Sequence, residues 1–137
     1  MINRSVAALI LYTKDRKVLM QHRSENAKRL PGWWGMFGGG IEEGETPEEA
    51  MKREMFEEIE YHSRNPRFFY SDENTIGGEH VTGYTFIEEY DETQPIVQHE
   101  GQGYGWFTIE EALKLKIIEP RRAALRKVEE YFKTLDA

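Results

Sequence analysis

Short apolar runs separated by polar segments characterise the first part of the chain. Residues 6–12 and 17–22 are mainly aliphatic, and they flank the polar residues 13–16. Runs of this length around a polar turn predict two strands joined by a hairpin. Residues 67–70 and 80–87 are rich in β-branched and aromatic side chains and predict two more strands, separated by a turn-rich stretch at 71–78. A last short strand is predicted at residues 104–107.

Two capping boxes mark helix starts between these strands. Thr46 precedes Pro47 and stands three residues before Glu49, so each side chain can satisfy a free amide of the first turn. We expect a helix from about residue 47 to residue 59. The same pattern begins at Thr108, and Pro120 opens an amphipathic segment that predicts a terminal helix. With no repeat or linker, residues 1–137 predict a single domain in which helices cover a sheet.

Charge and composition restrict the function. The formal net charge of −7 argues against stable binding of nucleic acid through its phosphates, which requires clustered basic residues. The chain has no cysteine, so disulfides and cysteine-bound zinc are excluded. Residues 6–12 are too few to span a membrane and lack a signal-peptide pattern, so we expect a cytoplasmic protein without a membrane partner. An acidic protein that handles phosphates would need metal cations.

Three acidic residues share one side of the predicted helix. At roughly 100° of rotation per residue, Glu54, Glu57 and Glu58 project within about one quadrant, and Ala50 and Met51 lie on or beside the same arc. These carboxylates repel one another and are costly to desolvate unless a cation compensates them. Oxygen-rich sites of this kind suit Mg²⁺, which takes one or two carboxylates and accepts its other ligands from water and phosphates.

A solvated acidic face is the simpler alternative, with Arg53 paired to Glu49 and Glu57 four residues away on either side. The segment before the helix favours a site instead. Residues 31–40 are too glycine-dense for a regular helix and predict a loop. Glycines let the backbone approach a ligand closely, and four of them precede the acidic helix: Gly38, Gly39, Gly40 and Gly44.

The spacing of the loop and helix residues resembles a known signature. The pattern is Gly39-x5-Glu45-x7-Arg53-Glu54-Met55-x-Glu57-Glu58, and it is similar to that of the Nudix hydrolases of MutT type. Around it, residues 38–45, Trp34 and Arg23 resemble the extended form of the family. Residues 100–107, followed by a capped helix, look like the carboxylate-bearing loop and Trp-Phe strand of that family.

This resemblance implies an α/β/α sandwich with a central mixed sheet, and an enzyme that uses Mg²⁺, or Mn²⁺ as the alternative, to hydrolyse a phosphoanhydride bond. It implies that Arg53 joins the loop to the helix, with Glu45 as its expected partner. The implied metal ligands are the Gly39 carbonyl and the carboxylates of Glu54, Glu57 and Glu58. Glu57 is the first candidate for the general base, and Glu100 is the second.

Two positions depart from the family pattern. Glu60 stands where the signature has a glycine, and Phe37 stands where a proline is common. Glycine normally permits the left-handed turn that closes a helix, so we expect this helix to end differently.

Specificity should lie outside the signature, because members of the family accept different nucleotides. A nucleoside triphosphate is favoured; nucleotide sugars, ADP-ribose and dinucleoside polyphosphates are the alternatives. Arg23, Lys28 and Arg29 are candidates for contacting phosphates. Each aromatic candidate for stacking on a base could instead belong to the hydrophobic core. These candidates are Trp33, Trp34, Phe37, Tyr84 and Tyr104.

Two competing functions use a similar fold. A nucleotide-binding regulator without turnover would have no need of the complete carboxylate set. An isomerase of isoprenoid diphosphates would need a reactive cysteine, which is absent. Apolar residues of the terminal helix could form a homodimer or pack on the sheet.

Overall fold

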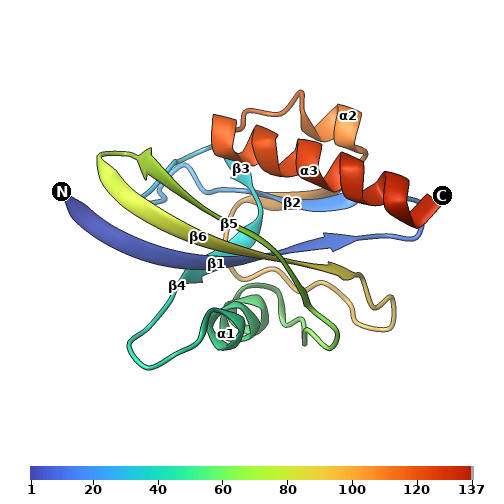
Figure 1. Cartoon of the computed structure of the whole chain (residues 1–137), viewed down its shortest axis with the longest axis horizontal. Coiled ribbons are helices and arrows are strands. Elements are labelled where there is room, and N and C mark those ends of the chain that lie inside the picture. The colour runs from blue at the N-terminus through green and yellow to red at the C-terminus, as the bar shows by residue number, and fades with distance from the viewer. Residues whose placement is uncertain (137) are drawn as a thin grey trace.

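A mixed sheet lies between helices in the computed structural model, which describes residues 1–136 (Figure 1). The elements follow in the order β1 (Ile2–Tyr12), β2 (Val18–His22), β3 (Trp34–Gly35), β4 (Phe37–Gly40), α1 (Pro47–Ile59), β5 (Arg67–Ile76), β6 (Glu79–Glu89), β7 (Gly103–Phe107), α2 (Ile109–Ala112) and α3 (Glu119–Asp136). Helix α1 covers one side of the strands, and α2 and α3 cover the other. The predicted sandwich is therefore confirmed.

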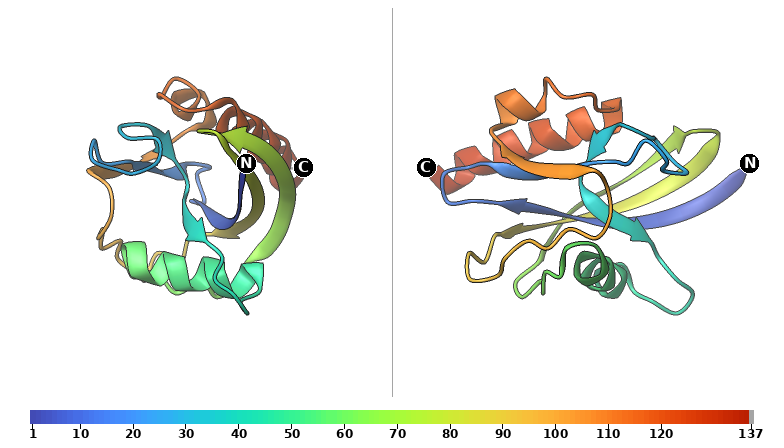
Figure 2. Two further views of the ribbon diagram at one scale, coloured as in Figure 1. Left: turned by 90° about the vertical axis from the view of Figure 1, so that its left-hand side faces the viewer. Right: turned by 180° about the vertical axis from the view of Figure 1, so that it is seen from behind.

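Strand β1 is the centre of the sheet because it pairs with three other strands. It runs parallel to β6 from Ile2 opposite Glu79 to Tyr12 opposite Glu89. Its other edge pairs with β4 at residues 6–9 and with β2 at Tyr12. Strands β5, β3 and β7 extend the sheet beyond these pairs. Figure 2 shows that β1, β5 and β6 curve along one side while β2, β3 and β7 lie on the other.

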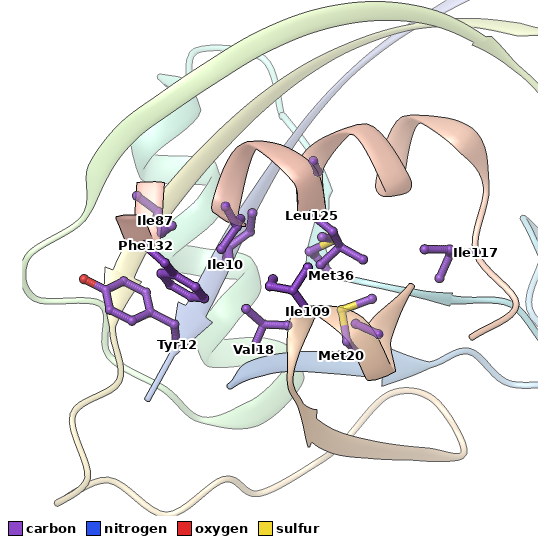
Figure 3. Close-up of a cluster of buried hydrophobic side chains, with 13 residues drawn as sticks. Ile10, Tyr12, Val18, Met20, Met36, Ile87, Ile109, Ile117, Leu125 and Phe132 are labelled. Carbon is purple, nitrogen blue, oxygen red and sulfur yellow. The ribbon is translucent and has the colours of Figure 1, made fainter. Parts of the chain in front are cut away.

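Alternate residues of β1 belong to two different cores. Ile10 and Tyr12 pack in the cluster under α3, which Figure 3 shows together with Leu125 and Phe132. Leu9 and Leu11 point to the opposite face and pack in the cluster under α1. Because both faces of β1 are buried, residues 6–12 form a continuous apolar run instead of an alternating pattern.

Helix α1 has the predicted bounds and the predicted capping box between Thr46 and Glu49. The expectation for its other end was wrong. Glu60 adopts the left-handed conformation with φ of 56°, and its N–H bonds to the carbonyls of Met55 and Phe56. The helix therefore closes as it would with glycine, although a side chain with a Cβ makes this conformation costly.

The sheet is larger than the sequence pattern predicts. β5 continues to Ile76 through the stretch expected to be a turn, because its polar residues pair with β6 from Ser71 opposite Tyr84 onward. The turn is confined to Gly77 and Gly78. β1 begins at Ile2, and most of the expected loop at 34–40 forms β3 and β4, which gain their hydrogen bonds from β2 and β1.

The terminal helix α3 packs its apolar face against the sheet. Ala124, Leu125, Val128 and Phe132 are all buried in the cluster under α3. No helix within residues 1–136 is long and apolar enough to cross a membrane.

Candidate active site

Helix α1 and the glycine-rich strand β4 meet at two carboxylates. The Gly38 N–H donates a hydrogen bond of 2.8 Å to Glu58. A Cβ at residue 39 would lie 2.5 Å from the carboxylate carbon of Glu54, so a larger residue here would displace that carboxylate. The Gly39 backbone therefore lies directly against the Glu54 carboxylate, as a shared metal site requires.

Arg53 joins the loop to the helix, as the resemblance implies. Its guanidinium donates two hydrogen bonds to Glu45, of 2.7 and 2.9 Å, and one of 2.9 Å to the carbonyl of Gly40. This fork of Arg53 holds the pKa of Glu45 at about 2, below its ordinary value of 4.5. The expected Arg53–Glu45 pair is present and fixes the loop before α1.

The same guanidinium reaches the acidic face of α1. Arg53 lies 2.8 Å from Glu54 and 3.4 Å from Glu57. Glu49 does not share in this pairing because its carboxylate accepts the Thr46 N–H in the capping box. The Glu57 side chain remains 59% exposed, whereas that of Glu54 is only 15% exposed. The acidic face is therefore partly buried rather than evenly solvated.

Glu58 is the most deeply buried acid of the site, with 2% of its surface exposed. Burial, together with the nearby carboxylates of Glu100 and Glu54, raises its pKa to about 10. Burial also raises the pKa of Glu54, although Arg53 opposes the shift. Acids arranged in this way need a cation to carry their charge at neutral pH.

The loop after β6 brings Glu100 to α1 from more than forty residues further along the chain. Its backbone carbonyl accepts hydrogen bonds from Gln98 at 2.7 Å and from Gln21 at 3.3 Å. Gln21, from β2, is buried, so the loop is fastened to the sheet as well as to the helix. Sequence spacing gave no indication of the Gln21 contact, because no local pattern links these segments.

The donor set fits a hard divalent cation. It combines carboxylate oxygens of Glu54 and Glu58 with the adjacent Gly39 backbone, and Glu100 lies beside Glu58. Within residues 1–136, no three acidic or histidine side chains converge closely enough to hold a metal ion by themselves. Mg²⁺ does not need three such ligands, because one or two protein carboxylates are enough when water and phosphate supply the others.

A cleft of about 860 Å³ opens beside these carboxylates. Glu54, Glu58 and Glu100 line one part of it. The basic residues that line the cleft are Arg4, Arg23, Lys28, Arg29 and Arg121. The cleft therefore has an acidic part and a basic wall, although the chain as a whole carries a net charge of −7.

The members of the basic wall differ in how they are held. Arg29 is paired with Glu79 at 2.8 Å, and Arg23 donates to the backbone carbonyl of Arg29. Over residues 1–136, by contrast, Arg4 and Arg121 have no carboxylate at ion-pair distance. Burial lowers the pKa of both, as does the nearby guanidinium of Arg29 in the case of Arg4. Sequence reasoning missed Arg4 and Arg121, because β1 and α3 bring them to the cleft from opposite ends of the chain.

The predicted aromatic residues are not among the residues that line this cleft. Trp34 stacks on His22 with ring centres 4.5 Å apart and meets Phe107 edge to face. The Lys116 ammonium lies over the Trp33 ring, 4.8 Å from the ring centre. These two tryptophans support the β2–β3–β7 side of the sheet.

The remaining aromatic candidates also have places in the fold. Phe37 is 1% exposed in the cluster under α1, and Tyr84 packs against that same cluster. Tyr104, on β7, is 41% exposed. Of the substrate-binding residues expected from the sequence, Arg23, Lys28 and Arg29 are the ones that line the cleft.

Comparison with known proteins agrees with this geometry. The model of the NUDIX domain matches residues 1–128. The NAD-capped RNA hydrolase NudC of Chromobacterium violaceum is 32% identical over 108 residues, and the nucleoside triphosphatase NudI of Enterobacter sp. is 37% identical over 59 residues. These matches cover 77% and 43% of this chain, but only 38% and 41% of the relatives. The MutT NUDIX hydrolase of Burkholderia pseudomallei superposes with a TM-score of 0.79 at 22% identity, covering 93% of this chain and 99% of that one.

A mixed sheet centred on β1, a capped acidic helix and an arginine-bound glycine loop define an α/β sandwich with a charged cleft. With the family model matching nearly the whole chain, the protein belongs to the Nudix family.

Proposed function

We propose that this protein is a Mg²⁺-dependent hydrolase that cleaves a phosphoanhydride bond in a nucleoside triphosphate or a related nucleotide. The observation that carries the proposal is the cleft itself. Carboxylates occupy one part of it and a basic wall the other, so one ligand with several phosphates can contact both. The Nudix fold and the complete set of signature acids support the same activity.

The carboxylates would hold the metal against the glycine strand. Glu54 faces the Gly39 backbone, Glu58 accepts the Gly38 N–H, and Glu57 extends the same helix face toward solvent. When bound, Mg²⁺ would neutralise phosphate charge and lower the pKa of an attacking water. Arg53 keeps the loop and helix at a fixed distance through Glu45 and Gly40, so the acids need not rearrange during the reaction.

Two acids are candidates for accepting the proton of that water. Glu57 lies among the signature acids but is largely exposed and paired with Arg53. Glu100 lines the cleft beside Glu58. A base must reach the water in the cleft, so the geometry favours Glu100 as the base. Glu57 keeps the role of metal ligand that the resemblance to the family implies.

The basic wall supports a polyphosphate substrate. Arg4, Arg23 and Arg121 carry charges that no carboxylate neutralises within residues 1–136, and phosphate oxygens are suitable partners for guanidinium groups. The relative NudI is named a nucleoside triphosphatase, which agrees with this choice. Nucleotide sugars, ADP-ribose and dinucleoside polyphosphates remain the alternative substrates, and a non-catalytic nucleotide-binding regulator is the alternative function.

The test is release of phosphate and pyrophosphate from a panel of these nucleotides, with Mg²⁺ and with chelator. Turnover of a nucleoside triphosphate that chelator abolishes and Mg²⁺ restores is the expected result. Turnover limited to another nucleotide class would change the substrate assignment. Tight binding without turnover across the panel would favour the regulator.

A further inference from the structure

Glu60, which replaces the usual glycine after the acidic pair, contacts the loop that carries Glu100. Its carboxylate lies 2.6 Å from the His99 ring nitrogen Nε2. His99 directly precedes Glu100, and its backbone N–H donates a hydrogen bond of 2.7 Å to the Glu58 carbonyl. Val97 donates in the same way to the carbonyl of Ile59 at 3.1 Å. The carboxyl end of α1 is therefore connected to this loop by backbone and side chain.

The backbone of Glu60 adopts a conformation that glycine would adopt more easily. Its φ of 56° lies in the left-handed region, where a Cβ is disfavoured. Non-glycine residues in such conformations occur where the surrounding structure fixes them, often next to functional sites. Here, replacing glycine supplies a carboxylate that glycine lacks, and His99 is its partner.

We propose that Glu60 and His99 are positioning residues whose hydrogen bond fastens the loop to α1 and holds Glu100 beside Glu58. The pair is about half exposed, so it adds little to global stability, yet it fixes the residue next to Glu100. This inference rests on the proposed function, because it matters only if Glu100 takes part in the reaction. Glu100 is also held through its carbonyl by Gln98 and Gln21, so losing the pair loosens the loop without releasing it.

The glycine substitution distinguishes positioning from a merely structural role, because the two effects have opposite signs. Glu60→Gly relieves the left-handed strain and should raise the melting temperature by about 2–4 °C. The same change removes the partner of His99 and should lower kcat by about tenfold, with little change in KM. Glu60→Gln keeps an oxygen that accepts a hydrogen bond from His99, so it should retain most of the activity.

Three further variants complete the test. His99→Ala should lower kcat as much as Glu60→Gly does, and the double variant should be no worse than either, because both changes remove one interaction. Hydrogen exchange at the backbone amide of residue 99 should be faster in both single variants. His80→Ala is the control, since it removes a similar exposed pair with Glu73, 3.1 Å apart, on the β5–β6 hairpin. It should leave kcat and the exchange of the loop unchanged.

Unchanged kcat in Glu60→Gly, or losses in the two single variants that multiply in the double variant, would overturn the proposal. Unaltered hydrogen exchange at His99 would do the same without reference to activity. Glu100→Gln separates this proposal from the proposed function. If it retains full activity, the role of Glu100 itself is wrong; if it loses activity while Glu60→Gly does not, only the positioning role is wrong.

Discussion

The Glu58 carboxylate accepts its hydrogen bond of 2.8 Å from the Gly38 N–H at a place where only 2% of the residue is exposed. This contact fixes α1 against β4 and places a carboxylate near both Glu54 and Glu100. One amide cannot compensate the charge of a carboxylate buried near two other acids, and Arg53 pairs with Glu54 rather than with Glu58. The geometry therefore stores an electrostatic cost that a bound cation would remove.

The first prediction concerns the electrostatic cost of the buried Glu58 carboxylate in the metal-free protein, measured in the presence of chelator. The pKa of Glu58 is raised from 4.5 to about 10, so the folded state binds more protons than the unfolded state between these values. The contribution of Glu58 to the stability of the metal-free protein should therefore be most favourable below pH 4.5. It should become less favourable as the pH rises toward 10. Glu58→Gln should remove this slope and raise the free energy of unfolding at pH 7 by about 1–3 kcal/mol.

Urea unfolding at several pH values measures this effect, because glutamine retains the oxygen that accepts the Gly38 N–H. Mg²⁺ should then raise the stability of the wild-type chain more than that of the variant. A variant that is less stable than the wild type at pH 7 in chelator would contradict the prediction.

The second prediction concerns the proton acceptor. Glu57→Gln and Glu100→Gln should each lower kcat by about 100-fold or more, because one removes a metal ligand and the other the favoured base. Steady-state kinetics at increasing Mg²⁺ separates the roles, since only the loss of a ligand should be partly overcome by more metal. Glu48→Gln is the matched control, because Glu48 lies on the same helix, does not line the cleft and pairs with Lys52. Full activity in Glu57→Gln would refute its assignment as a ligand.

The third prediction concerns the basic wall. Arg121→Gln should raise KM by about tenfold and change kcat little, because its charge would contact phosphate in both the ground state and the transition state. The exposed Arg126, one turn or so along the same helix, provides the control Arg126→Gln, which should leave both constants unchanged. Equal effects of the two substitutions would show that only the overall charge of the helix matters.

The fourth prediction concerns the fork between Arg53 and Glu45. Lysine cannot donate two parallel hydrogen bonds, so Arg53→Lys should loosen the glycine loop and lower both kcat and stability. Glu45 has its pKa depressed from 4.5 to about 2, so its contribution is present above 4.5 and is lost as the pH falls through 2. Acid unfolding followed by circular dichroism should therefore begin at a higher pH in Arg53→Lys. Lys52→Met is the control, and an acid transition shared by both variants would argue against the fork.

Local interactions made α1 and the placement of its acidic residues predictable. The capping box lies within four residues, and the spacing of Glu54, Glu57 and Glu58 fixes their shared side of the helix whatever surrounds it. The glycine and arginine spacing identified the family for the same reason. The full length of β5 and the strands within residues 34–40 were not predictable, because their hydrogen bonds come from distant partners.

The sequence by itself determined the family, the capped acidic helix and the acids available to a metal, since these depend on spacing along a few turns of chain. Only the tertiary structure decided which side chains share the cleft. Parallel pairing of β1 with β6 and the packing of α3 bring Arg4 and Arg121 to one wall, while the loop tied to Glu60 brings Glu100 to Glu58. Such contacts join segments far apart in sequence, and no local periodicity encodes them.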